Sequence, residues 1–211
     1  MTTENRRPLS SRNNRLTQSF AHWLAANKIL TPNQISCLAM VFAAIGALLL
    51  AFSTHPAALI VTALMVQLRL LCNLFDGMVA VEGGLKTATG DLYNELPDRF
   101  SDSVFLVALG YAAGWPDLSW LAALLAAGTA YIRVFGGSLG LPQSFRGPMA
   151  KQHRMAALTA ACLLGALESH YAQSQYALQA ALLAIIAGSV LTCYYRIRDI
   201  AALLKQRDAA K

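Results

Sequence analysis

Oxygen-bearing side chains are concentrated in one short part of this 211-residue chain. Six of its eleven acidic residues fall within 27 consecutive positions: Asp76, Glu82, Asp91, Glu95, Asp98 and Asp102. On one predicted helix Asn73 lies three positions before Asp76, and on the next the carboxylates and Asn94 recur with a helical period. Two such stripes that face each other would suit a hard divalent cation such as Mg²⁺ or Mn²⁺. Charges of one sign would otherwise repel, so a metal or a positive partner is implied.

The elements that must position these residues are those of a membrane protein. Hydrophobic residues make up 56% of the chain, charged residues only 13%, and the mean hydropathy is +0.45. Soluble domains contain about a quarter charged residues. Six apolar runs occur, of which the third, fourth and fifth are short for a bilayer span of about 20 residues: 36–52, 57–75, 103–115, 118–131, 155–167 and 176–195.

Positive charge resolves the number of spans. All 17 Lys and Arg residues lie in the N-terminal arm, around the segments between runs two and three and between runs four and five, or in the tail. The other three connections, 53–56, 116–117 and 168–175, contain neither residue type. Six spans with both termini inside place every basic residue on the cytoplasmic side. The net charge of +6 is therefore a topological signal and does not indicate nucleic-acid binding.

We therefore predict an all-α integral membrane protein with six transmembrane helices. Residues 1–30 form a cytoplasmic arm with an amphipathic interfacial helix, whose apolar face includes Phe20 and Trp23. Residues 31–203 form the transmembrane domain, and 204–211 a cytoplasmic tail. Thr31 is the expected N-cap of the first span with Pro32 at N1. No cleaved secretory signal is expected, and the four isolated cysteines are interpreted as small apolar fillers.

The acidic segment resembles the signature of the CDP-alcohol phosphotransferase family, D-x2-D-G-x2-A-R-x8-G-x3-D-x3-D. It aligns without gaps, and five of the eight signature positions match: Asp76, Gly77, Ala80, Gly90 and Asp98. The signature falls in the second and third of six predicted spans, where the family carries it. The Thr31-Pro32-Asn33 start before the first span also resembles the family.

The resemblance implies an enzyme that transfers the phosphatidyl group of CDP-diacylglycerol to a small polar alcohol, with or without a phosphate group, and releases CMP. It implies that Asp98 accepts the proton of the acceptor hydroxyl, and that Mg²⁺ or Mn²⁺ is bound by Asp76, Asp98, Asn73 and Asn94. Gly77, Ala80 and Gly90 would lie next to the nucleotide. Candidate phosphate contacts are the four cations of an acid-free segment: Arg133, Arg146, Lys151 and Arg154. Also implied are a homodimer, a bacterial inner membrane and an active site that faces the cytoplasm.

Three signature positions differ from the family. Asn73 and Asn94 replace aspartates and Val81 replaces arginine. Each asparagine removes one negative charge, so we hypothesise that Asp91 or Glu95 supplies a displaced ligand. Two alternatives stay open: a non-catalytic relative that binds nucleotide or lipid, and a small cation transporter. A transporter would need polar residues that continue across the membrane toward Asp117 and Glu168, whereas the distal halves of these helices are apolar.

Overall fold

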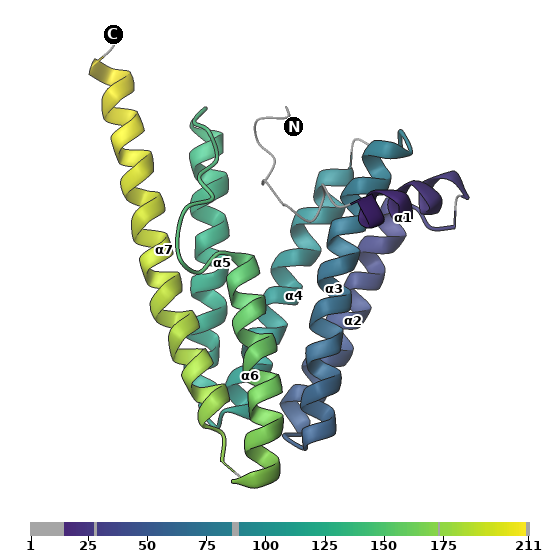
Figure 1. Cartoon of the computed structure of the whole chain (residues 1–211). Coiled ribbons are helices and arrows are strands. Elements are labelled where there is room, and N and C mark those ends of the chain that lie inside the picture. The colour runs from purple at the N-terminus through teal and green to yellow at the C-terminus, as the bar shows by residue number, and fades with distance from the viewer. Residues whose placement is uncertain (1–14, 28, 86–88, 173, 210–211) are drawn as a thin grey trace.

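A computed structural model describes residues 15–27, 29–85, 89–172 and 174–209, and the regular secondary structure in this part of the chain is all α-helix. The short helix α1 precedes six long ones (Figure 1). The helices are α1 (Arg15–Ala26), α2 (Pro32–Phe52), α3 (Pro56–Glu82), α4 (Gly90–Ala112), α5 (Pro116–Ser138), α6 (Lys151–Tyr171) and α7 (Tyr176–Ala209). The all-α prediction is confirmed.

The start of α2 is fixed by a capping box. The hydroxyl of Thr31 accepts a hydrogen bond from the backbone N–H of Gln34 at 3.3 Å, and the side-chain oxygen of Gln34 accepts one from the N–H of Thr31 at 2.9 Å. Pro32 follows in the first turn, where its missing N–H costs nothing. The predicted N-cap is therefore confirmed, and the chain enters its first apolar helix at a defined residue.

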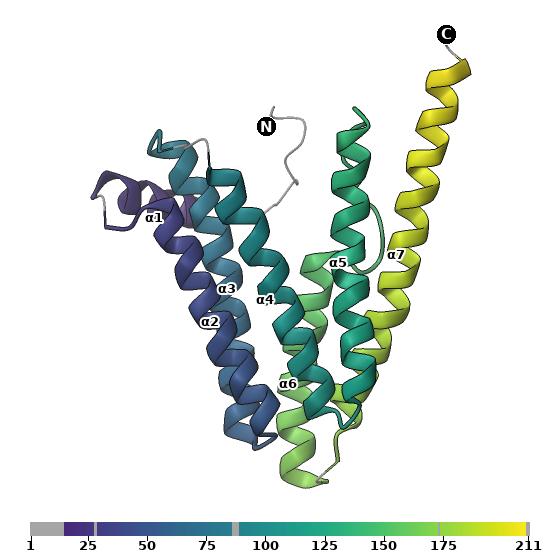
Figure 2. The ribbon, with the colours of Figure 1, turned by 180° about the vertical axis from the view of Figure 1, so that it is seen from behind.

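The six long helices alternate in direction. The connections α2–α3, α4–α5 and α6–α7 lie at one end of the molecule, whereas α1 and the C-terminal end of α7 lie at the other (Figures 1 and 2). Among the described residues, four helices are long and apolar enough to cross a bilayer: α2, α3, α5 and α7. Helices α4 and α6 have comparable lengths, but their N-terminal halves carry the charged residues discussed below.

The long helices pack around one large apolar core, which lies toward the end of the molecule that holds the α2–α3, α4–α5 and α6–α7 connections. Helix α2 packs on α3 and α4, α4 on α5, α3 on α6, and α7 on both α5 and α6. Phe105, Leu109, Leu158 and Leu182 are fully buried in this core. Gly110 lets α4 approach α5 closely, because a Cβ at this position would lie 2.1 Å from the Cβ of Ser119.

Helix α1 lies across the end of the bundle rather than along it (Figure 1). Ala21 and Leu24 are buried, and the ring of Phe20 meets that of Phe75 on α3 edge to face at 5.0 Å. Phe20 and Trp23 are still about half exposed, at 46% and 50%. Such a helix suits a membrane interface, with one side on protein and its aromatic side chains toward lipid.

Helix α4 carries two different stripes. Asp98 and Asp102, one turn apart, are buried toward the other helices. Another stripe of the same helix exposes large apolar side chains at every fourth position: Leu92, Leu96, Phe100 and Val104. The helix continues through Pro97, which lies in its second turn rather than its first.

The connection between α5 and α6 is held against α7. Gly147 has a positive φ of 127°, and a Cβ there would lie 2.5–2.8 Å from the side-chain atoms of Thr192. The hydroxyl of Thr192 also accepts a hydrogen bond from the N–H of Met149 at 3.0 Å. Helix α7 itself runs unbroken through residue 204, where we had placed the start of a tail, as far as Ala209.

Candidate active site

Asp98 is the most highly connected carboxylate at the polar end of the bundle. Its Oδ1 accepts hydrogen bonds from Arg69 at 3.0 Å and from the amide of Asn73 at 2.7 Å, and its Oδ2 is bonded by the ammonium of Lys151. These partners come from α3 and α6, whereas Asp98 lies on α4. Two signature positions, 73 and 98, are thus brought into direct contact.

Asp102, one turn further along α4, pairs with two buried arginines. Arg69 Nη2 lies 2.8 Å from its Oδ1, and Arg154 Nη2 lies 2.9 Å from its Oδ2. Arg69 and Arg154 are 0% and 1% exposed. Arg154 also donates to the backbone oxygen of Met149 at 2.8 Å. Buried ions require such close pairing, because removal from water is costly unless opposite charges and hydrogen bonds compensate.

Asp76 is buried near this cluster but differs from the other two aspartates. Its side chain is 3% exposed, and its Oδ2 accepts a hydrogen bond from the hydroxyl of Ser36 on α2 at 2.7 Å. Its Oδ1 has no hydrogen-bond partner among the described residues. Asp98 and Lys151 both act on Asp76 electrostatically. A buried, unpaired carboxylate oxygen is costly in an apolar surround, and a bound cation would satisfy it.

Glu95 and Arg133 form a second ion pair beside the cluster. Arg133 Nη2 donates to both carboxylate oxygens of Glu95, at 2.9 and 2.8 Å, and its Nη1 donates to Gln143 at 3.0 Å. Arg99 binds the same carboxylate at 3.0 Å. The guanidinium of Arg133 also lies 5.3 Å from the ring centre of Phe145. Glu95 is therefore engaged with two arginines in this structure.

The remaining candidate residues are more dispersed. Arg146 is exposed, pairs with Asp199 on α7 at 3.0 Å and lies over the ring of Tyr195. Asn94 is exposed. Gly77 and Ala80 lie half-buried on the last turns of α3, and Gly90 is the first residue of α4. The backbone of Asp91 is helical, but its side chain lies outside the described part of the structure.

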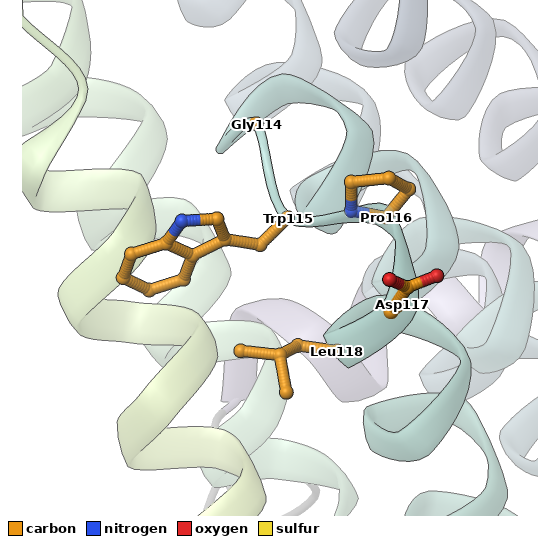
Figure 3. A pocket seen from close by; sticks show the side chains of 5 residues that line it. All are labelled: Gly114, Trp115, Pro116, Asp117 and Leu118. Atoms are coloured by element: carbon orange, nitrogen blue, oxygen red, sulfur yellow. The ribbon is translucent and has the colours of Figure 1, made fainter.

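A hollow at the opposite end of the bundle has a different character. It is formed by the α4–α5 turn and lined by Gly114, Trp115, Pro116, Asp117 and Leu118 (Figure 3). The carboxylate of Asp117 and the indole of Trp115 point to opposite sides of this turn. The apolar core around Phe105 and Leu109 lies along α4 between Asp102 and this hollow. The predicted lack of a polar path toward Asp117 is consistent with this arrangement.

The side chains at this end suit a divalent cation that takes its remaining ligands from a bound substrate. Among the described side chains, no three carboxylate, histidine or cysteine groups converge as a protein-only metal site. Mg²⁺, however, is often held by one or two carboxylates together with substrate phosphates and water. Asp76 offers a free buried oxygen for such a site, and Asp98 lies close enough to influence it.

The fold and the site thus define a helical membrane protein with buried carboxylates and cations at one end. The model of the CDP-alcohol phosphatidyltransferase family matches residues 29–193, and the chain belongs to this family. It is a divalent-metal-dependent CDP-alcohol phosphotransferase, which moves a phosphatidyl group from CDP-diacylglycerol to an alcohol.

Individual relatives agree in length and fold. An uncharacterized protein of Aquifex aeolicus (strain VF5) is 28% identical over 176 residues, which cover 81% of this chain and 82% of that protein. Mycobacterium tuberculosis phosphatidylinositol phosphate synthase with CDP-DAG bound is similar in structure, with a TM-score of 0.72, 22% identity, and coverage of 89% and 94% of the two chains. The structure of the same synthase in complex with manganese and citrate has a TM-score of 0.71 and 21% identity, and the match covers 87% of this chain and 88% of that chain.

Three residues of this site were not among the sequence candidates: Arg69, Asp102 and Ser36. Arg69 had been counted with the topological charges, and Asp102 only with the acidic stripe. A signal for Arg69 was present, because it lies four and seven positions before Asn73 and Asp76 and therefore on the same helical face. No comparable signal distinguishes Ser36, whose role depends on how α2 packs against α3.

Proposed function

We propose that the alcohol acceptor is small and polar, with a phosphorylated alcohol favoured, and that the reaction takes place at the Asp76–Asp98 end of the bundle. The observation that carries this proposal is the convergence of cations from α3 and α6, Arg69 and Lys151, on signature residue Asp98. The Arg133–Glu95 pair lies beside them. CDP-diacylglycerol carries a charged diphosphate, and an acceptor phosphate would add further negative charge. The four cations predicted as phosphate contacts, Arg133, Arg146, Lys151 and Arg154, all lie at this end.

In this proposal Asp98 is the catalytic base. A carboxylate within hydrogen-bond reach of the acceptor hydroxyl can take its proton as the oxygen attacks phosphorus. Arg69 and Asn73 fix the orientation of Asp98 through its Oδ1. The half-buried Gly77, Ala80 and Gly90 would lie beside the nucleotide, because glycine has no side chain and alanine only a methyl group, so a ligand can approach the backbone closely.

Asp76 and Asp98, with the amide oxygens of Asn73 and Asn94, are the proposed holders of the metal. Mg²⁺ or Mn²⁺ bound there would neutralise the diphosphate and stabilise the departing CMP. The manganese complex of the mycobacterial structural neighbour supports this choice of ions. Asp91 and Glu95 are the candidates for a displaced ligand. For Glu95 this role requires release from Arg133 and Arg99, with which it now pairs.

We also propose that α4 and α6 span the membrane, which gives six spans with both termini in the cytoplasm. Their length of 23 and 21 residues supports this, as does the clustering of their charges at one end. The active site would then face the cytoplasm, in the inner membrane of a bacterium. A homodimer is proposed from the family resemblance. Protease protection of tags at the two termini in oriented vesicles would test the topology.

The central experiment measures CMP release by the purified protein with CDP-diacylglycerol, Mg²⁺ or Mn²⁺ and a panel of alcohols that includes phosphorylated ones. We expect release with at least one acceptor and its loss in Asp98→Ala. No release with any acceptor, together with retained nucleotide or lipid binding, would indicate the non-catalytic alternative. Metal flux through reconstituted vesicles without CMP release would indicate the transporter.

The displaced-ligand hypothesis has its own test. In Asp91→Asn and Glu95→Gln variants, the metal concentration that half-saturates CMP release should rise for whichever residue binds the metal. If neither variant changes the metal dependence, neither residue is a ligand. Asp199→Asn is a matched control, because Asp199 also pairs with an arginine, Arg146, but lies outside the cluster.

A further inference from the structure

The buried cluster around Asp98 is balanced in charge without a metal ion. It contains three buried carboxylates, Asp76, Asp98 and Asp102, and three cations that pair with them, the buried Arg69 and Arg154 and the partly exposed Lys151. Their formal charges therefore cancel. Replacement of a signature aspartate by Asn73 contributes to this balance, since one more carboxylate beside Asp98 would leave the cluster negative.

Within this cluster the two proposed metal-binding carboxylates are not equally available. Asp76 keeps a buried oxygen without a hydrogen-bond partner. Asp98 has both oxygens engaged, Oδ1 by Arg69 and Asn73 and Oδ2 by Lys151. A cation that binds both aspartates therefore competes with the contacts that Asp98 already makes.

Of the two cations that contact Asp98, Lys151 is the one that can be withdrawn at lower cost. Arg69 is fully buried and bridges Asp98 and Asp102, so its withdrawal would leave two carboxylates short of a partner. The side chain of Lys151 is 13% exposed, and Asp98 is its hydrogen-bonded partner in the described structure. It is the first residue of α6, and its long flexible stem can swing toward the polar end.

We propose that Lys151 holds the place of the divalent cation at Asp98 in the ligand-free protein, and that the metal binds by displacing it. This rests on the proposed role of Asp98 as a metal ligand. The displaced ammonium carries its charge to the mouth of the site, where a substrate phosphate can accept its hydrogen bonds. Lys151 thus changes its hydrogen-bond partner from the Asp98 carboxylate to a substrate phosphate when metal and substrate bind.

The test is a Mn²⁺ titration of the substrate-free protein in lipid nanodiscs. Electron paramagnetic resonance measures the concentration of free Mn²⁺ at each step of the titration. Lys151→Gln should bind Mn²⁺ about tenfold or more tightly than the wild type, which is the size of effect that a neighbouring opposite charge has on proton affinity. Lys151→Arg keeps the charge and should bind as weakly as the wild type. Lys205→Gln, at an exposed position on α7, controls for the loss of one positive charge. Unchanged or weaker binding in Lys151→Gln would overturn the proposal, as would tighter binding that survives the addition of Asp76→Asn.

A second measurement needs no variant and covers the case in which Lys151→Gln fails to fold. Reductive methylation followed by mass spectrometry reports how accessible each lysine is. Saturating Mg²⁺ should raise the methylation of Lys151 while that of Lys205 stays constant, and an unchanged or lowered rate at Lys151 would contradict displacement. Both readouts report on metal binding alone. A failure of the proposed transferase function would appear instead in the CMP assay.

Discussion

The ammonium of Lys151 on α6 is bonded to the carboxylate of Asp98 on α4, 53 positions earlier in the chain. Asn73 and Arg69 on α3 reach the same carboxylate. Side chains from three helices therefore meet at one group that the family signature contains.

Asp98→Asn should lower the rate of CMP release at least about 100-fold, because an amide cannot accept the hydroxyl proton and general-base groups contribute roughly that much. Steady-state assays with saturating donor and metal measure the effect. Asp199→Asn should retain near wild-type turnover. An Asp98→Asn enzyme with more than a tenth of the wild-type rate would exclude Asp98 as the base.

Arg69→Leu should destabilise the protein by about 3–5 kcal/mol, because it leaves Asp98 and Asp102 buried with fewer partners. Arg146→Leu is the matched control. Its side chain is 66% exposed, and loss of its pair with Asp199 should cost about 1 kcal/mol or less. Thermal or denaturant unfolding in detergent gives both values. Equal effects for the two variants would show that the buried pairs are no more important than the exposed one.

Asn73→Asp should make stability depend on metal. The amide of Asn73 donates to Asp98 Oδ1 at 2.7 Å, whereas an aspartate would face that oxygen with a like charge. The variant should melt at a lower temperature than the wild type in EDTA and recover with Mg²⁺. Asn94→Asp, at an exposed position, should change much less. Equal melting temperatures for Asn73→Asp with and without Mg²⁺ would contradict this prediction.

Glu168 should give stability a dependence on acidic pH. It lies beyond the apolar part of α6 and accepts hydrogen bonds from the N–H groups of Tyr176 and Ala177, at 2.7 and 2.8 Å, at the start of α7. Desolvation alone would raise the pKa of Glu168, but the hydrogen bonds from Ser174, Ala177 and Tyr176 outweigh it, and the net shift is downward.

A lowered pKa in the folded state means that this stabilisation is complete above the unfolded value of about 4.3 and is lost as the pH falls through the folded value. Glu168→Gln should therefore lower the melting temperature at pH 7, and the difference from the wild type should shrink in strongly acidic buffer. A constant difference at every pH would show that the carboxylate charge is not responsible.

Several elements could be predicted from the sequence because they depend on local signals. The Thr31 cap depends only on residues 31–34. The one-sided distribution of Lys and Arg predicted that the polar segments lie together at one end of the bundle. The partner of each charge could not be predicted. Whether Lys151 meets Asp98 or Arg133 meets Glu95 depends on the rotation of each helix about its axis, which packing of apolar side chains sets. Arg69 was missed for the same reason, since a basic residue near a helix end is usually a topological charge.

The two stripes of α4 have a consequence for how a lipid reaches Asp98. The buried stripe presents carboxylates, and the exposed stripe presents Leu92, Leu96, Phe100 and Val104 along the same few turns. Asp98 and Phe100 are two positions apart and therefore lie on nearly opposite faces of the helix. A lipid whose headgroup is to reach Asp98 must therefore enter beside α4 and not across its apolar stripe. The apolar stripe instead anchors α4 in hydrocarbon, which keeps the carboxylates on the opposite face inside the bundle.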